Sequence, residues 1–327
     1  LTDCSDAPTV SITGQDGSAT MQWQYSNDNT NWYNIIGATS SSEEAPYSSK
    51  ATVWIRNQLT NGCVKYSDYI VHLSSAASGC NFWEGTVSTD AANTANWSQG
   101  SLPASTSTDV LILKTISNSP TYGSEVAGMT AGNLWIQDGA TLNAGIIEHF
   151  VSGNLTNNGS LDASTGTFNL KSTTAQAMNG TAGSTFYNLS INNSSTGVTL
   201  GAQATVGNEF TLTSGIVDAN AANLVLTSAA TVIGGADASH VLGTMVKTTA
   251  ATSQFTFPVG DGTQYKAISI TPQNGTSTEW SAKYFNTVYS STTLSGSNSG
   301  DIDHVSTYEY WDLSRPSGSD NAKVEIP

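Results

Sequence analysis

Short runs of alternating apolar and polar residues recur along the whole chain. In Met21–Tyr25 the apolar side chains alternate with two glutamines, the period-2 pattern of a strand with one buried face. The run Val53–Arg56 alternates in the same way, and Asn61–Gly62 is a turn signal. A tryptophan at the buried positions is typical of an immunoglobulin-like sandwich. We therefore predict such a sandwich over residues 1–75, with strands at 9–13, 19–26, 32–36, 51–59 and 66–73.

A short unit, Asn-Leu-x-Ile/Leu, recurs from about residue 130. Its copies start at positions 133, 188 and 223, and looser copies start at 154, 169 and 209. Their mean separation, about 18 residues, is close to the repeat lengths of solenoids, whose coils bury apolar residues by stacking. We predict a right-handed parallel β-helix, with a capping entry segment, over residues 76–245. The irregular spacing leaves a meander of antiparallel hairpins as the alternative. The expected core residues are Leu134, Ile136, Leu155, Leu170, Leu189, Ile191, Phe210, Leu212, Leu224 and Leu226.

The pattern changes again after Gly243. Alternating runs at 255–257, 265–271 and 280–285 predict a second β-sandwich over residues 246–327. Val324–Pro327 has the pattern of a strand that is cut short, so we expect this region to be incomplete. The predicted fold is therefore all-β, with an N-terminal sandwich, a central β-solenoid and a C-terminal sandwich.

Charged residues are scarce, which narrows the classes of partner. Asp, Glu, Lys and Arg make up 11% of the chain, against about 25% in an ordinary soluble domain. The formal net charge is −15, and Arg56 and Arg315 are the two arginines of the sequence. Nucleic acids and anionic membranes are bound by clusters of Lys and Arg, so we expect neither partner. No apolar run approaches the ~18 residues of a membrane span, so we expect no membrane insertion.

The three cysteines, Cys4, Cys63 and Cys80, include no Cys-x-x-Cys pair that would suggest zinc. We predict a disulfide between Cys4 and Cys63, which would join the first strand to the final hairpin of the N-terminal domain. Cys80 would then be a leftover thiol. Three reduced cysteines are the alternative.

The polar residues do not suggest catalysis. The four histidines are far apart, and the acids of the repeat region do not recur at matching positions. A polysaccharide-cleaving site needs carboxylates at a defined separation, so we predict no enzyme activity. Exposed aromatic rings can stack on sugars, and Trp32, Trp54 and Trp135 are the candidates, although core packing is the alternative for each. No cofactor is expected, except that Asp301 and Asp303, in a Gly/Ser/Asn-rich loop, are candidate calcium ligands.

Several motifs resemble those of large surface proteins of Bacteroidota. Met21–Asp28 with Asn61–Cys63 is similar to their immunoglobulin-like modules. Gly85–Asp90, the Asn-Leu-x-Ile units and Phe255–Gly260 are similar to their β-helical regions, although Ala91 stands where the related pattern usually has Trp. The resemblance implies export by the type IX secretion system and a secreted or outer-surface location.

Together these observations favour a non-catalytic adhesin or stalk, a class that includes gliding-motility filaments. The expected partners are surface glycans, other cell-surface proteins or further copies of the chain. Two alternatives stay open. One is a carbohydrate-binding accessory region of a secreted polysaccharide-degrading enzyme, and the other is a subunit of an extracellular filament.

Overall fold

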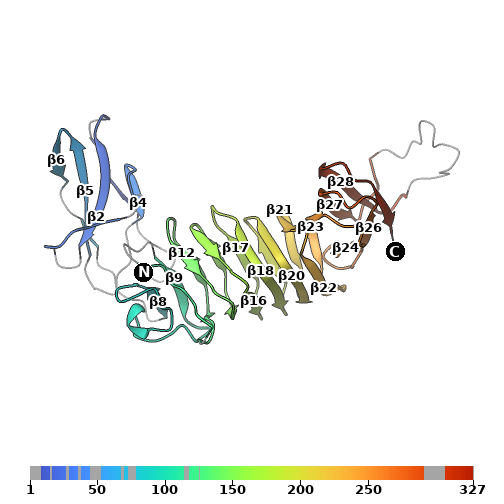
Figure 1. Cartoon of the computed structure of the whole chain (residues 1–327), viewed down its shortest axis with the longest axis horizontal. Coiled ribbons are helices and arrows are strands. Elements are labelled where there is room, and N and C mark those ends of the chain that lie inside the picture. Colours follow the sequence, from blue (N-terminus) through green and yellow to red (C-terminus); the bar gives the residue numbers. More distant parts are fainter. Residues whose placement is uncertain are drawn as a thin grey trace. The chain divides into compact units, whose positions relative to one another are not determined.

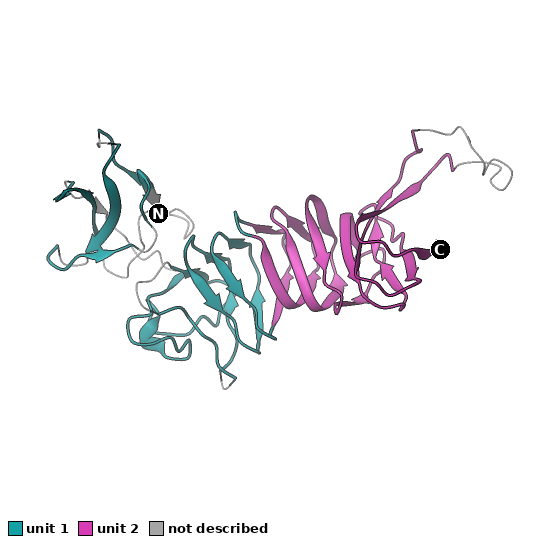
Figure 2. Ribbon diagram, turned by 45° about the horizontal axis from the view of Figure 1, so that its top comes forward, with its two compact units in different colours: residues 1–166, 180–182 teal, residues 167–179, 183–327 magenta. Residues whose placement is uncertain are grey.

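The computed structural model describes residues 9–14, 17–26, 29–35, 38–44, 53–67, 70–72, 79–113, 118–124, 126–290 and 306–326. Strands account for 53% of the structure, and the described part contains one short 3-10 helix, η1 (Thr94–Asn96). The all-β prediction is therefore confirmed. The chain forms two compact units, residues 1–166 with 180–182 and residues 167–179 with 183–327 (Figure 2). A β-solenoid of about seven turns occupies residues 110–260.

The N-terminal residues form two antiparallel sheets, the pair β1-β4 and a five-stranded sheet of β2, β3, β5, β6 and β7, with a small apolar core. β2 pairs with β5 from Thr20↔Thr60 to Ser26↔Trp54, and a tight hairpin at Asn61–Gly62 links β5 to β6. The core consists of Val10, Trp23, Ile35, Ala38 and Ile55. The strands are β1 (Thr9–Ser11), β2 (Thr20–Ser26), β3 (Tyr33–Asn34), β4 (Ser42–Glu44), β5 (Val53–Asn61), β6 (Cys63–Tyr66) and β7 (Ile70–His72).

Parallel pairing begins in the first unit. Val110, Leu134 and Leu155 are paired in register, so they occupy equivalent positions of successive coils. All three are fully buried, so each coil covers the apolar residues of the coil before it. The strands are β8 (Cys80–Trp83), β9 (Asp109–Ile112), β10 (Thr130–Ala131), β11 (Leu134–Ile136), β12 (Thr141–Asn143), β13 (Glu148–Val151), β14 (Leu155–Asn157) and β15 (Ser160–Asp162).

The second unit contains the most regular coils. On one face Phe168, Leu189, Phe210 and Val232 are in register from coil to coil. Figure 1 shows their strands β16, β18, β20 and β22 side by side. The pairing is parallel, which excludes the hairpin meander because hairpins pair antiparallel. The strands are β16 (Thr167–Ser172), β17 (Gln176–Asn179), β18 (Ser184–Asn193), β19 (Val198–Leu200), β20 (Ala204–Ser214), β21 (Val217–Leu226), β22 (Thr231–Gly234) and β23 (Val241–Thr249).

The other faces of these coils have their own ladders. Val198, Val217, Val241 and Val259 are in register on one face. Another ladder runs through Phe186, Val206 and Leu226 and ends at Lys247. All ten predicted core residues of the solenoid are at most 4% exposed. Burial of each such side chain contributes about 1.5–3 kcal/mol, so each coil is stable mainly as part of the stack.

The register corrects two of the predicted repeat starts. Phe168 is in register with Leu189, so the unit placed at Asn169 begins earlier, at Thr167. Leu224 pairs with Ala204 and Met245, so the unit at Asn223 lies on a different face from the units at 188 and 209. The units at 133 and 154 lie on a third face, because β11 and β14 belong to the ladder that continues through β17 and β19. Alternation alone does not distinguish the faces of a coil, and for this reason the predicted repeat length was too short.

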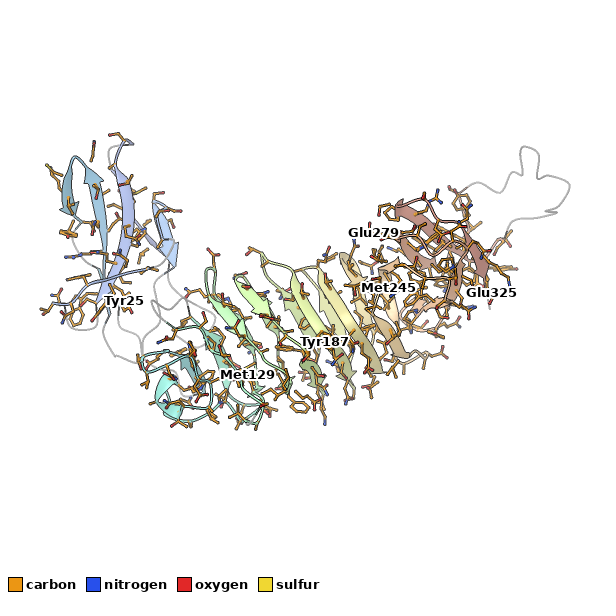
Figure 3. All side chains as sticks on the ribbon, in the orientation of Figure 1. Tyr25, Met129, Tyr187, Met245, Glu279 and Glu325 are labelled. Atoms are coloured by element: carbon orange, nitrogen blue, oxygen red, sulfur yellow. The ribbon has the colours of Figure 1, made fainter. Side chains whose placement is uncertain are left out.

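The parallel stack ends where β23 pairs antiparallel with β27, which in turn pairs antiparallel with β28. Met245, a fully buried residue of β23, faces Ala282 across this boundary (Figure 3). A separate three-stranded sheet has the order β24-β26-β29. The strands are β24 (Phe255–Phe257), β25 (Val259–Gly260), β26 (Ile268–Pro272), β27 (Thr278–Phe285), β28 (Tyr310–Ser317) and β29 (Ala322–Glu325).

Candidate functional site

The side of the N-terminal sheet opposite its apolar core carries amides and aromatic rings. Gln24 of β2 lies at the centre. Its Nε2 donates to Asn34 Oδ1 at 2.8 Å and to Gln58 Oε1 at 2.9 Å, and its Oε1 accepts from Arg56 Nε at 2.9 Å. The alternation of β2 and β5 produces this arrangement, because Trp23 and Ile55 point to the core and their neighbours point away from it.

Arg56 stacks on two aromatic rings of the same side. Its Cζ lies 4.0 Å from the ring centroid of Trp32 and 3.8 Å from that of Tyr66. Trp54 lies two residues before Arg56 in β5, so it points to the same side of the sheet, and it is half-buried. We call this side of the sheet the Arg56 face, and it consists of Gln24, Trp32, Asn34, Trp54, Arg56, Gln58 and Tyr66.

The three tryptophans predicted to stack on sugars have different surroundings. Trp32 and Trp54 are brought together on the Arg56 face, where aromatic rings and amides could contact a sugar. Trp135 lies elsewhere, on β11, and packs against the apolar cluster of Cys80, Phe82, Leu111 and Leu113. Its indole nitrogen is buried without a hydrogen-bond partner. Trp135 is therefore a core-packing residue, which was the alternative to sugar stacking in the sequence analysis.

The predicted disulfide between Cys4 and Cys63 is wrong. Cys63 is a free, exposed thiol at the start of β6, whereas Cys80 is buried and disulfide-bonded. Cys4 lies outside the described residues. The prediction failed because sequence proximity to a hairpin does not show where a thiol points. Cys63 follows a tight turn, and every residue of β6 is exposed.

The candidate calcium ligands Asp301 and Asp303 lie outside the described residues. Among the residues that the structure does describe, no group of three or more His, Cys, Asp or Glu could hold a metal ion.

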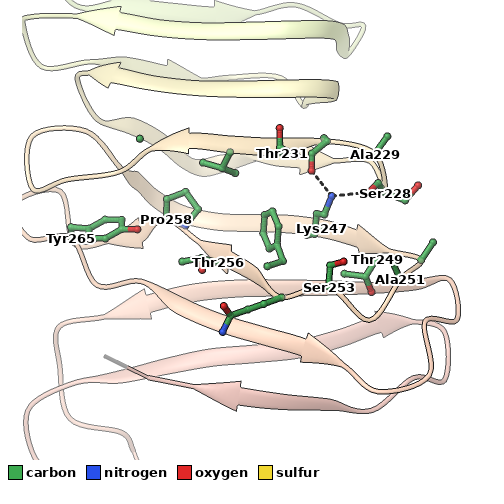
Figure 4. A pocket seen from close by; sticks show the side chains of 16 residues that line it. Ser228, Ala229, Thr231, Lys247, Thr249, Ala251, Ser253, Thr256, Pro258 and Tyr265 are labelled. Carbon is green, nitrogen blue, oxygen red and sulfur yellow. Dashed lines mark hydrogen bonds between the residues drawn. The ribbon is translucent and has the colours of Figure 1, made fainter.

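A pocket of about 380 Å³ lies at the end of the solenoid in the second unit, between residues 228–234 and residues 253–258 (Figure 4). Lys247 borders it and is 4% exposed. The Lys247 ammonium donates to the carbonyls of Thr227, Ser228 and Ala230 at 2.6, 3.2 and 2.6 Å. Burial lowers the pKa of Lys247 to about 8. Because its three donors are all used, Lys247 holds the turn of the preceding coil rather than a ligand.

Two fully buried histidines also serve the backbone. His240 Nε2 accepts from the amide of Gly262 at 3.0 Å, and Nδ1 lies 3.1 Å from Ala236 O. With Nε2 accepting from the Gly262 amide, Nδ1 is the nitrogen that can donate to the Ala236 carbonyl. A Cβ on Gly260 would lie 2.6 Å from the His240 ring, so the close approach requires glycine there. His149 is held in the same way, between the Met129 amide and Ala144 O, and burial lowers its pKa.

Arg56 was not identified from the sequence as the centre of a surface site, nor was Lys247 identified as a buried residue of the core. Arg56 is two residues from both Trp54 and Gln58, so the alternation of β5 could have placed it on the same, polar side of the strand. Lys247 is separated from the buried Val241 and Met245 by an even number of residues, so the alternation of β23 could have placed it in the core.

A family model described as a domain of unknown function (DUF8696) matches residues 2–74. This segment contains the Arg56 face. Neither the curated proteins nor the solved structures include a match to the chain.

Proposed function

We propose that this chain is a non-catalytic segment of an extracellular surface protein, an adhesin or stalk, that contacts surface glycans through the Arg56 face. The observation that carries the proposal is the arrangement of that face. Arg56 stacks on Trp32 and Tyr66 while Gln24 fixes the surrounding amides. Rings that stack on sugars and amides that bond to hydroxyls are the two kinds of group that carbohydrate recognition uses.

The solenoid supports the spacer part of the proposal. Each coil adds about 4.8 Å along the stack, and its apolar side chains are covered by the next coil. Outward positions carry small polar residues such as Thr199 and Thr185, both exposed. Such a scaffold is rigid and extends by repetition. We propose that its coils are right-handed and that the sheets at its two ends belong to immunoglobulin-like sandwiches.

The buried ionisable groups support a non-catalytic role. His149, His240 and Lys247 all bond to backbone atoms of neighbouring segments. Each of these side chains therefore has a structural task.

The location and the remaining partners are part of the same proposal. The resemblance of several motifs to those of Bacteroidota surface proteins supports secretion by the type IX system and a place on the outer surface. Other surface proteins or further copies of the chain are additional proposed partners. Within the described residues, no helix is long and apolar enough to cross a membrane.

A second candidate, an accessory region that holds a polysaccharide-degrading enzyme on its substrate, is favoured by the same face. An adhesin and an accessory region share glycan binding, so they differ in the glycan recognised. Insoluble plant or algal polysaccharides would point to the accessory role, and host or bacterial surface glycans to adhesion.

Retention on a glycan array and on insoluble polysaccharides tests the proposal. Wild-type protein should be retained by at least one glycan, and Tyr66→Ala should abolish retention. Tyr308→Ala is the matched control, because Tyr308 is an aromatic residue of the other unit and is 80% exposed. Absence of retention at physiological salt, or equal loss in both variants, would contradict a glycan role for the Arg56 face.

A further inference from the structure

The guanidinium of Arg56 is held in one orientation. The ring centroids of Trp32 and Tyr66 lie 4.0 and 3.8 Å from Cζ, so the two rings cover part of the guanidinium and limit its rotation. The nitrogens at its edge, Nε, Nη1 and Nη2, are its hydrogen-bond donors. One part of that edge, Nε, is fixed by Gln24, and Gln24 is itself fixed by Asn34 and Gln58. The side chain therefore has little rotamer entropy left to lose on binding a ligand.

The rest of that edge is unused within the described part of the chain. Nη1 and Nη2 make no hydrogen bond there, and the ion pairs found among the described residues are Lys266–Glu309 and Lys323–Glu325. The chain contains 25 acidic residues and two arginines, so acidic side chains are plentiful. Even so, this arginine pairs with an amide and two rings.

We propose that Arg56 binds the carboxylate of an acidic sugar, such as a uronic acid unit of an anionic polysaccharide. This inference rests on the proposed glycan-binding function and names its ligand class. A planar fork with two parallel donors matches a carboxylate in bidentate geometry. The amides of Asn34 and Gln58 lie on the same face and can bond to the ring hydroxyls of the same sugar.

The charge of the chain sets the conditions of the experiment. At −15 the protein repels an anionic polymer at long range, but the Debye length at 0.15 M salt is about 8 Å. The Arg56–carboxylate contact acts over a much shorter distance. Binding should therefore be measured near physiological salt, where the repulsion is screened.

The test compares polygalacturonate, a neutral polysaccharide of similar length and a sulfated polysaccharide in the same affinity assay. Wild-type protein should prefer polygalacturonate. Arg56→Gln should bind it about 10- to 100-fold more weakly, the loss expected for a hydrogen-bonded charge pair. Arg56→Lys keeps the charge but not the fork, and should be intermediate. Arg315→Gln removes the same charge from the other unit and should bind like wild type. Thermal unfolding of each variant verifies that it is folded.

Each outcome discriminates. Equal binding of neutral and acidic polymers would overturn the acidic-sugar inference and leave glycan binding intact. A preference for the sulfated polymer would overturn the carboxylate assignment. Binding of polygalacturonate by a folded Arg56→Gln variant with wild-type affinity would remove Arg56 from the site. Failure to bind all three polymers, together with an unresponsive glycan array, would overturn the proposed function as well.

Discussion

Phe210→Ala should destabilise the second unit by about 4 kcal/mol, because Phe→Ala changes in cores cost about 3–5 kcal/mol. Phe210 is fully buried and lies in register between Leu189 and Val232. Removing its ring costs the transfer free energy of the ring and leaves a cavity. We expect a loss no smaller than the middle of this range, about 4 kcal/mol. β18 and β22 both pair with β20, so the backbone around Phe210 is fixed on both sides and cannot collapse into the space.

Urea denaturation followed by circular dichroism measures this change, and a loss of about 4 kcal/mol corresponds to a melting temperature roughly 8–16 °C lower for a unit of this size. Thr211→Ala is the control in the same coil. Thr211 points outward, where its hydroxyl bonds to Glu209, so its loss should cost under about 1 kcal/mol. Equal destabilisation by the two variants would refute the inward–outward alternation on which the solenoid core is based.

Three further predictions concern Lys247, Cys63 and Asn96. Burial lowers the pKa of Lys247 to about 8, against 10.5 for an ordinary lysine, so between these pH values the unfolded chain binds the proton more tightly than the folded chain. The free energy of unfolding should therefore rise with pH over this range by up to about 3 kcal/mol relative to Lys247→Met. Parallel pH profiles of the two proteins would contradict this. Iodoacetamide should label Cys63 in the native, unreduced protein, and mass spectrometry that finds label on Cys80 instead would reverse the assignment. Asn96 is fully buried and forms hydrogen bonds with Val87, Ser88 and Asp90. Asn96→Ala should therefore lower the free energy of unfolding, measured by urea denaturation, by about 3 kcal/mol. A decrease under about 1 kcal/mol would show that these bonds contribute little.

Much of the fold could be predicted from the sequence, because burial and alternation are local properties. The ten expected core residues of the solenoid are buried, and the hairpin turn at Asn61–Gly62 is present. Which strands pair was harder to predict. Leu224 and Leu189 have the same local pattern, yet they lie on different faces, because the coils turn at points that the pattern does not mark.

The candidate site was predictable only in part. Trp32 and Trp54 were expected to be accessible, but the contact that organises the face, Arg56 on Trp32 and Tyr66, joins residues of β5 and β6 with the residue just before β3. The disulfide prediction failed for a similar reason, since the exposure of Cys63 depends on the pairing of β5 with β6. Lys247 could have been placed in the core by its position in the alternation of β23, but its three carbonyl partners belong to the turn of the preceding coil, which the alternation does not identify.

Hydrogen–deuterium exchange with and without a retained glycan tests the account most directly. If the Arg56 face binds the ligand while the coils serve as a scaffold, protection should appear in residues 20–34 and 53–66, and exchange in residues 167–260 should not change. Protection confined to the coils, or to the pocket residues 228–234 and 253–258, would contradict this division of roles.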